Sequence, residues 1–88
     1  MTKVILDADD LELFASQLNA FNKSLADQCT NLRGQYRRLG ETWRDPQYAV
    51  FAKEFERTIT NLQRFQAIAN EVIPMLRKKA QRARDVHR

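Results

Sequence analysis

The chain has 88 residues, which is enough for one small domain. Hydrophobic residues make up 43% of it and charged residues 30%, a balance too apolar for a disordered chain and too polar for a membrane protein. No apolar run approaches the length of a membrane span, and no signal peptide opens the sequence. We therefore expect a cytoplasmic product at synthesis, with no membrane insertion, that would have to leave the cell without a cleaved leader.

The first expected element is a long helix over about residues 8–43. Asp7 is a good N-cap, because its carboxylate can accept hydrogen bonds from the free N–H groups of the first turn. Asp9 and Asp10 follow it, and their negative charges suit the positive end of the helix dipole. Large apolar residues then recur at steps of three, four or seven, which is the spacing of a helical stripe. These residues are Leu11, Phe14, Leu18, Phe21, Leu25, Leu32 and Leu39.

The expected turn covers residues 43–46, which are Trp43, Arg44, Asp45 and Pro46. Asp45 can cap a new helix, and Pro46 fits its first position, where no intrahelical hydrogen bond is lost. Because the residue before a proline disfavours the helical region, the first helix should end before Pro46. A connection this short makes the two helices antiparallel neighbours.

A second helix is expected over about residues 46–84. Pro74 interrupts its pattern, because proline lacks a backbone N–H and its ring clashes with the carbonyl of Asn70, so we expect a kink there. Past Pro74 the pattern thins into a basic tail that should fray toward the end of the chain. Apolar residues recur at steps of three or four along this helix, which are Tyr48, Phe51, Phe55, Ile59, Leu62, Phe65, Ala69, Val72, Leu76 and Ala80.

The need to bury the apolar stripes of both helices predicts a partner for this hairpin. Each helix should be on the order of 50 Å long, and a lone hairpin so long and thin covers only part of each apolar stripe. A second hairpin would complete a four-helix bundle. We therefore predict an all-α fold, a single domain over residues 1–88 that forms an antiparallel helical hairpin and dimerises. The predicted dimer or hairpin seam comprises Leu11, Phe14, Leu18, Phe21, Leu25, Leu32, Leu39, Phe51, Phe55, Leu62, Phe65 and Val72.

The turn carries a resemblance to a known family. A small helical chain with Trp-x-Gly between two helices is similar to the WXG-motif family of type VII secretion substrates, the early secreted antigenic target proteins. Trp43 stands where that family has its motif Trp, and Asp45 stands where it has Gly. Tyr48, Phe51 and Phe55 look like the aromatic positions that the family places early in its second helix. The resemblance covers essentially the whole chain.

The resemblance implies a hairpin that forms a four-helix bundle with itself or with a related helical hairpin. It also implies export of the folded protein, without a cleaved signal, by an ATPase-driven secretion machine. The turn residues 43–46 would then form the surface that the export apparatus recognises, with Trp43 at its centre. The family's C-terminal signal, Tyr-x-x-x-Asp/Glu, is absent, because the residues four beyond Tyr36 and Tyr48 are Gly40 and Ala52. Either a partner supplies this signal, or the chain works outside that pathway.

The net charge of +4 is unevenly distributed, with acidic residues in the first twelve positions and basic ones in the last twelve. In an antiparallel hairpin these two ends lie side by side, so one interpretation is that they attract each other. The other is that the tail contacts a polyanion or an acidic membrane surface. The tail has no interleaved aromatic residues to stack on bases, which disfavours nucleic acid. The candidate polyanion contacts are Arg77, Lys78, Lys79, Arg82 and Arg84.

The sequence offers no catalytic or cofactor-binding constellation. His87, the sole histidine, is one residue from the end of the expected fraying tail, where no neighbouring groups would hold it as a base or ligand. Cys29, the sole cysteine, lies within a helical pattern and is expected to act as a small hydrophobe. We therefore expect no enzyme, no metal and no cofactor. Three hypotheses remain: a WXG-like secretion-associated dimer, an intracellular adaptor or chaperone with the same bundle, and a polyanion-binding hairpin.

Overall fold

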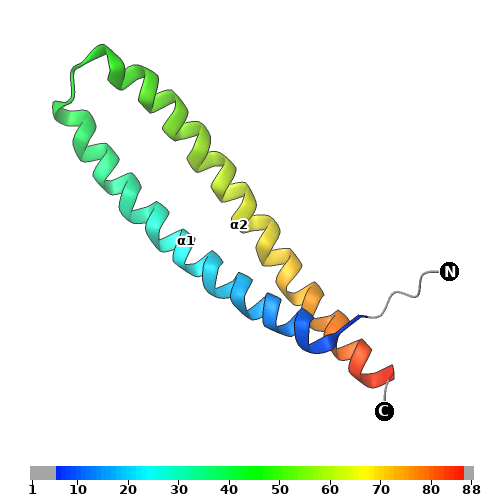
Figure 1. Cartoon of the computed structure of the whole chain (residues 1–88). Coiled ribbons are helices and arrows are strands. Elements are labelled where there is room, and N and C mark those ends of the chain that lie inside the picture. The colour runs from blue at the N-terminus through cyan, green and yellow to red at the C-terminus, as the bar shows by residue number, and fades with distance from the viewer. Residues whose placement is uncertain (1–5, 87–88) are drawn as a thin grey trace.

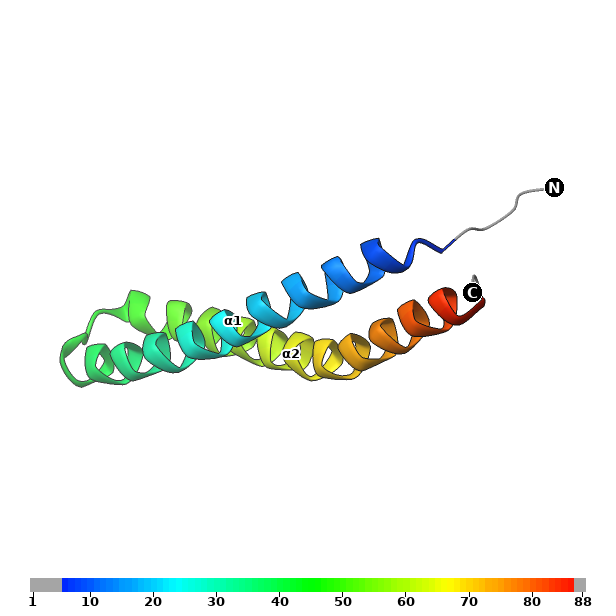
Figure 2. The same cartoon turned by 90° about the horizontal axis from the view of Figure 1, so that it is seen from below.

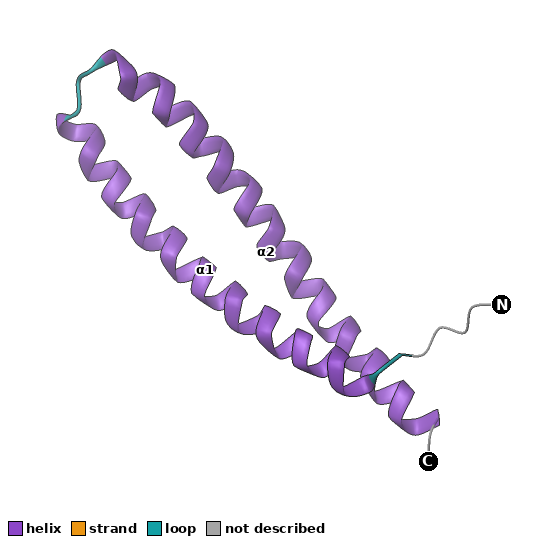
Figure 3. Cartoon of the chain, in the orientation of Figure 1, coloured by secondary structure: helices purple, strands orange, loops and turns teal. Residues whose placement is uncertain are grey.

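The computed structural model describes residues 6–86 as a hairpin of two helices (Figure 1). Helix α1 spans Ala8–Thr42 and helix α2 spans Pro46–Val86, with residues 43–45 between them. The helices run antiparallel, and the described part of the chain contains no strand (Figure 3). They also twist about each other. In Figure 1 they lie side by side near the turn and overlap near the opposite end, whereas in Figure 2 they overlap near the turn and are separated at the opposite end. The predicted all-α hairpin is confirmed.

Helix α1 begins at the predicted N-cap. The Asp7 carboxylate accepts hydrogen bonds from the backbone N–H groups of Asp9 and Asp10, with its Oδ1 at 2.9 and 3.2 Å from the two nitrogens. The carbonyl of Asp7 accepts the first helical hydrogen bond from the N–H of Leu11 at 3.1 Å. These contacts satisfy donors that would otherwise lack partners at the start of the helix.

The turn is three residues long, and hydrogen bonds fix both of its sides. The N–H of Trp43 donates to the carbonyl of Leu39 at 2.8 Å, after which the backbone becomes extended. The Asp45 carboxylate accepts from the N–H of Gln47 at 2.9 Å, so Asp45 caps α2 as the sequence predicts. Pro46 takes the first helical position, where its missing N–H removes no bond.

Helix α2 continues through Pro74 without interruption. Pro74 has no N–H to donate to the carbonyl of Asn70, which removes one rung of the helical ladder. Figure 2 shows α2 curving gradually along its length, so the expected kink takes the form of a gentle bend. The helix extends to Val86, two residues beyond the expected end, and His87 and Arg88 lie outside the described residues.

The contact between the two helices is thin. The hairpin measures 64 × 28 × 15 Å, so it is one helix layer thick. Within residues 6–86, no large side chain is fully buried, and neither helix is long and apolar enough to cross a membrane. Many large apolar side chains therefore stay partly in solvent. The buried residues are Ala15, Asn22, Ile59, Ala69, Ile73 and Ala80.

Candidate functional site: an apolar face beside an aromatic turn

An apolar groove runs between the two helices on one side of the hairpin. Its volume is about 460 Å³, and Gln28, Glu54 and Thr58 are the polar residues in its lining. A second hollow of about 160 Å³ extends it toward the turn, because both are lined by Leu32, Phe51 and Phe55. The apolar lining of the main groove consists of Leu25, Cys29, Leu32, Phe51, Phe55, Ile59 and Leu62.

Exposed aromatic side chains extend this groove toward the open end of the hairpin. Phe21 and Phe65 meet edge to face, with ring centroids 6.1 Å apart, and they are 57% and 41% exposed. Phe14 lies seven residues before Phe21, on the same stripe of α1, and is 55% exposed. We call the combined surface the apolar face. It comprises Phe14, Phe21, Leu25, Leu32 and Leu39 of α1 and Phe51, Phe55, Leu62 and Phe65 of α2.

The twelve predicted seam residues divide into two groups, and none of them is buried. Six are exposed, which are Phe14, Phe21, Leu32, Leu39, Phe51 and Phe65. The other six are half-buried, which are Leu11, Leu18, Leu25, Phe55, Leu62 and Val72.

The seam prediction omitted every residue that the hairpin buries, although the predicted apolar stripe of the second helix included Ile59, Ala69 and Ala80. Ala15 and Asn22 directly follow Phe14 and Phe21, so the buried stripe of α1 lies beside the aromatic one. The large side chains dominate the sequence pattern, although it is the smaller residues that allow the two helices to approach closely. The seven-residue spacing of Ala15 and Asn22 is the signal that could have identified this stripe.

Five aromatic residues gather at the turn. Trp43 packs against Tyr48 and Phe51, with ring centroids 5.3 and 5.9 Å away. Tyr36 stacks on Phe55 at 4.3 Å and lies 6.1 Å from Tyr48. Trp43 is half-buried, so one part of its ring holds the turn to α2 while another part stays accessible. Its neighbours Arg44, Asp45 and Pro46 are exposed.

Two features of this aromatic cluster were not predicted from the sequence. A hydrogen bond with Tyr48, together with partial burial, raises the pKa of Tyr36 to about 12. Gly40 leaves room for Tyr48, because a Cβ atom at Gly40 would lie 2.6 Å from the tyrosine Oη.

Asp45 stands where the WXG motif has glycine, and no non-glycine residue among those described has a positive φ, so this turn does not need glycine at that place.

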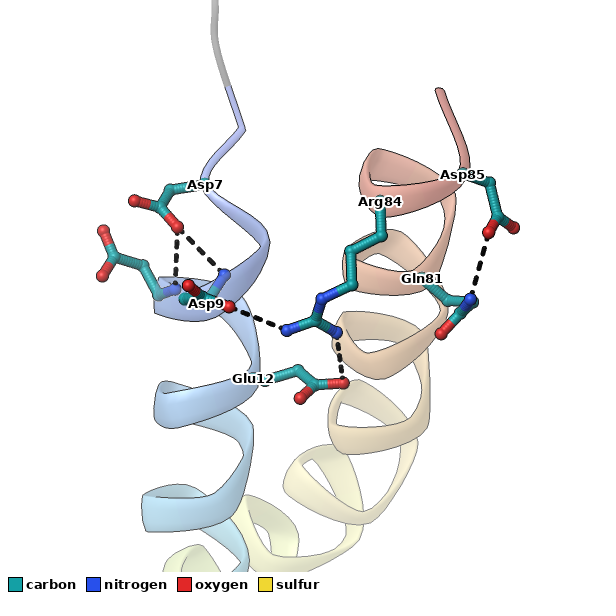
Figure 4. Close-up of polar contacts among 7 residues, drawn as sticks. Asp7, Asp9, Glu12, Gln81, Arg84 and Asp85 are labelled. Carbon is teal, nitrogen blue, oxygen red and sulfur yellow. Dashed lines mark hydrogen bonds and ion pairs between the residues drawn. The ribbon is translucent and has the colours of Figure 1, made fainter. Parts of the chain in front are cut away.

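At the open end of the hairpin, Arg84 of α2 binds two carboxylates of α1 (Figure 4). Its Nη2 lies 2.9 Å from Asp9 Oδ1, and its Nη1 lies 2.8 Å from Glu12 Oε1. The hydrogen bonds to Glu12 and Asp9 raise the pKa of Arg84. The charge of Arg84 is therefore engaged within the hairpin, in keeping with the interpretation that the acidic and basic ends attract each other.

The other four basic candidates have a different environment. Within residues 6–86, no carboxylate forms an ion pair with them. Three of them line a hollow of about 350 Å³ together with Glu71, Pro74 and Met75. The four residues are Arg77, Lys78, Lys79 and Arg82, of which the last three line the hollow.

The described residues hold no group of three or more His, Cys, Asp or Glu side chains that could bind a metal ion. His87 lies outside the described range. Cys29 is a free, half-buried thiol in the wall of the apolar groove. The arrangement of this chain thus offers surfaces for contact with other molecules, at the apolar face and at the turn.

Neither a protein-family model nor a curated protein matches this sequence. Among solved structures, the hairpin matches the crystal structure of ESXB, a secreted protein of Bacillus anthracis, with a TM-score of 0.73. The chain has the fold of that secreted protein. The match covers 100% of both chains at 20% sequence identity, so the likeness is one of fold. It agrees with the helical hairpin that the resemblance to the early secreted antigenic target proteins implies.

Proposed function

We propose that the protein is a WXG-like interaction protein of a type VII-like secretion system and that it acts as a homodimer. The observation that carries this proposal is the apolar face, which runs from Phe14 to the turn. The fold shared with a secreted protein supports the link to secretion. The chain works by contact with proteins in this proposal, and no reaction is assigned to it.

The apolar face is large enough for a specific interface. Six of its residues are between 41% and 57% exposed. Because a phenylalanine side chain buries about 150–250 Å² when fully covered, these six offer on the order of 500 Å² per copy. Two copies then bury roughly 1,000 Å² from these side chains alone, which is about the area that a biological interface should exceed. About 500 Å² per copy matches the largest apolar patch of a typical soluble monomer, and such patches are often functional. The six residues are Phe14, Phe21, Leu32, Leu39, Phe51 and Phe65.

A second copy of the chain is the occupant that fits this face best. Phe14 and Leu39 are 25 positions apart on α1, a span of roughly 37 Å at the helical rise. Only another long element can cover a stripe of that length, and the hairpin itself presents one. Glu54 is the one charged residue in the lining of the main groove, so two copies can approach face to face with little charge repulsion.

The oligomeric state tests this proposal. The purified protein should have a molar mass twice the 10.3 kDa of the chain by light scattering, and it should melt cooperatively. Leu32→Glu places a carboxylate in the centre of the face and should weaken the dimer at least tenfold. Val50→Glu is the matched control, because Val50 is 70% exposed and lines neither part of the groove, and this variant should remain dimeric.

Two results would refute the homodimer. A stable, cooperatively folded monomer would show that the apolar face needs no cover. A loosely helical or aggregating wild-type protein that folds only with a different helical hairpin would show that the partner is a second gene product.

We assign recognition by the export machinery to the turn residues 43–46, around the accessible part of Trp43. Full-length protein should appear in the culture medium of its host with the mass of the uncleaved chain, and a secretion ATPase should be required. Trp43→Ala should reduce export while the dimer mass and helicity persist. If Trp43→Ala only lowers the melting temperature and leaves export unchanged, Trp43 is a packing residue. Retention of the dimer inside the cell would favour an intracellular adaptor or chaperone instead.

A polyanion-binding role is the second candidate. The observation that favours it is the group of four basic side chains without ion pairs within the described residues, Arg77, Lys78, Lys79 and Arg82. Binding to anionic vesicles or heparin should then fall steeply with salt and disappear in the variant with all four changed to glutamine. Nucleic acid remains a disfavoured ligand, because no aromatic residue is interleaved with these cations.

A further inference from the structure

A cluster of side-chain amides interrupts the apolar contact between α1 and α2. Asn22 is 6% exposed and is the one buried polar residue in the described part of the chain. Its Nδ2 donates to the backbone carbonyl of Gln66 at 3.2 Å and to Oδ1 of Asn70 at 3.1 Å. We call these three residues the amide cluster. The other buried residues are all alanine or isoleucine, so the hairpin interior is polar at this single level.

Stability does not explain the amide cluster. Asn22 Oδ1 and the side-chain nitrogen of Gln66 are buried without a hydrogen-bond partner in the described residues. A partly satisfied polar network is less stable than a well-packed apolar pair at the same place. Buried amides of this kind in helical pairs are known instead to specify register at the expense of stability.

The apolar residues of the hairpin leave its register ambiguous. The interior stripes repeat every seven residues, so sliding one helix past the other by seven positions places apolar residues opposite apolar residues again. In such a shift Asn22 would face Ile59 instead of Gln66, and its amide would be buried against an aliphatic side chain. The stripes are Ala15, Asn22, Cys29 and Tyr36 in α1 and Ile59, Gln66, Ile73 and Ala80 in α2.

The sequence also contains a second place where the chain could turn. A hairpin shifted by seven residues needs its turn three to four positions earlier than residues 43–45, which brings it to Gly40. Glycine readily ends a helix, so Gly40 is a second place where α1 could stop, although a turn there would put Pro46 beyond the first position of α2, where proline is disfavoured. We propose that the amide cluster fixes the register of the hairpin and acts together with the Asp45–Pro46 pair to select the turn at 43–45 over a turn at Gly40.

The selected register has a functional consequence, which rests on the proposed function above. It puts Trp43 at the tip of the hairpin and brings Phe21 beside Phe65, and Leu32 beside Phe51 and Phe55, in one apolar face. A shift of seven residues, roughly 10 Å along the axis, would break up this face. The amide cluster therefore determines the surface that the second copy meets.

Distance measurements between the helices test this proposal. Spin labels are attached to cysteines replacing Ser16 and Arg77 in a Cys29→Ala chain, and the labelled chain is diluted with unlabelled chain so that only distances within one hairpin are seen. The parent should give one distance. The variant with Asn22→Leu and Gln66→Leu should give two, and its melting temperature should equal or exceed that of the parent. Asn22→Ala, a milder change, should also give two distances and serves if the double variant does not fold.

The matched control is Asn31→Leu with Gln63→Leu, which makes the same two changes at exposed positions. It should keep one distance. A single, unchanged distance in both amide-cluster variants would overturn the proposal, and so would two distances in the control. The molar mass of the parent is measured in parallel. If the parent is monomeric and shows one distance between its labels, while the variants show two, the homodimer is refuted and the register proposal stands.

Discussion

The two glycines of α1 provide a sharp test of the turn's packing. Nothing lies within 4 Å of a Cβ atom built at Gly34, so Gly34→Ala should gain the usual benefit of replacing a helical glycine, about 0.5–1 kcal/mol. For a domain of this size, that gain corresponds to a rise in melting temperature of roughly 3–6 °C. The same substitution at Gly40 brings the new methyl group 2.6 Å from Tyr48 Oη and 3.3 Å from its Cζ.

The clash at Gly40 should reverse the sign of the effect. The Tyr48 ring cannot move freely, because it packs against Trp43 and Tyr36. Overpacking of this kind costs about 1–3 kcal/mol, which exceeds the helical gain. We expect the free energy of unfolding of Gly40→Ala to be about 1 kcal/mol lower than that of the parent protein. It should be roughly 2 kcal/mol lower than that of Gly34→Ala.

Thermal and urea unfolding followed by circular dichroism at one fixed protein concentration would measure the difference, since the melting of a dimer depends on concentration. The fluorescence of Trp43, the single tryptophan, should change in Gly40→Ala and not in Gly34→Ala. Adding Tyr48→Phe removes the nearest atom and should restore part of the loss, as a double-mutant cycle would show. If Gly40→Ala stabilises the protein as much as Gly34→Ala, the close approach of Tyr48 does not constrain this turn and our reasoning is wrong.

Three further predictions concern the caps and charges. Arg84→Ala should lower the melting temperature at about 50 mM salt, and the deficit should shrink toward zero near 1 M, where charges are screened within about 3 Å; a deficit independent of salt would contradict an electrostatic role. The raised pKa of Tyr36 means that the folded state keeps a proton that the unfolded state loses, so this contribution to stability is complete below the ordinary value of 10.0 and is lost as the pH rises through about 12. The fall in stability over this range should be steeper in the wild type than in Tyr36→Phe, and equal slopes would rule the contribution out. Asp45→Ala should cost about 1 kcal/mol and Asp45→Gly a few tenths, measured by urea unfolding; a gain from Asp45→Gly would show that the turn prefers the glycine of the WXG motif after all.

The sequence was sufficient to predict the elements of the hairpin, because the signals involved are local. Asp7 and the Asp45–Pro46 pair cap the two helices through bonds to residues two or three positions away. The large apolar stripes correctly indicated helices. The predicted stripe of α2 contains the buried Ile59, Ala69 and Ala80. In α1 the pattern did not reveal the buried stripe, because the large Phe14 and Phe21 stand beside Ala15 and Asn22 and dominate a hydrophobic pattern.

Contacts between the helices could not be read from the sequence. The approach of Tyr48 to Gly40 depends on how the turn folds back, and the bonds from Asn22 to Gln66 and Asn70 depend on the register. The pairing of Arg84 with Asp9 and Glu12 was foreseen as an attraction between the acidic and basic ends. The sequence does not show that a single guanidinium forms ion pairs with both carboxylates, which is seen only in the structure.

Because of the three-residue turn, the two ends of the molecule differ: one end holds the turn and the other holds both ends of the described chain. The start of α1 and the end of α2 lie at the extremity remote from the turn (Figure 1), and the hairpin is 64 Å long. A fluorophore attached at Val86, which is 79% exposed, therefore marks one extremity only. In a head-to-head pair two such labels would be neighbours and would exchange energy efficiently, whereas in a head-to-tail pair they would be separated by most of the length of the bundle. One label, attached to a Val86→Cys chain in which Cys29 is replaced by alanine, can thus determine the orientation in which two copies assemble.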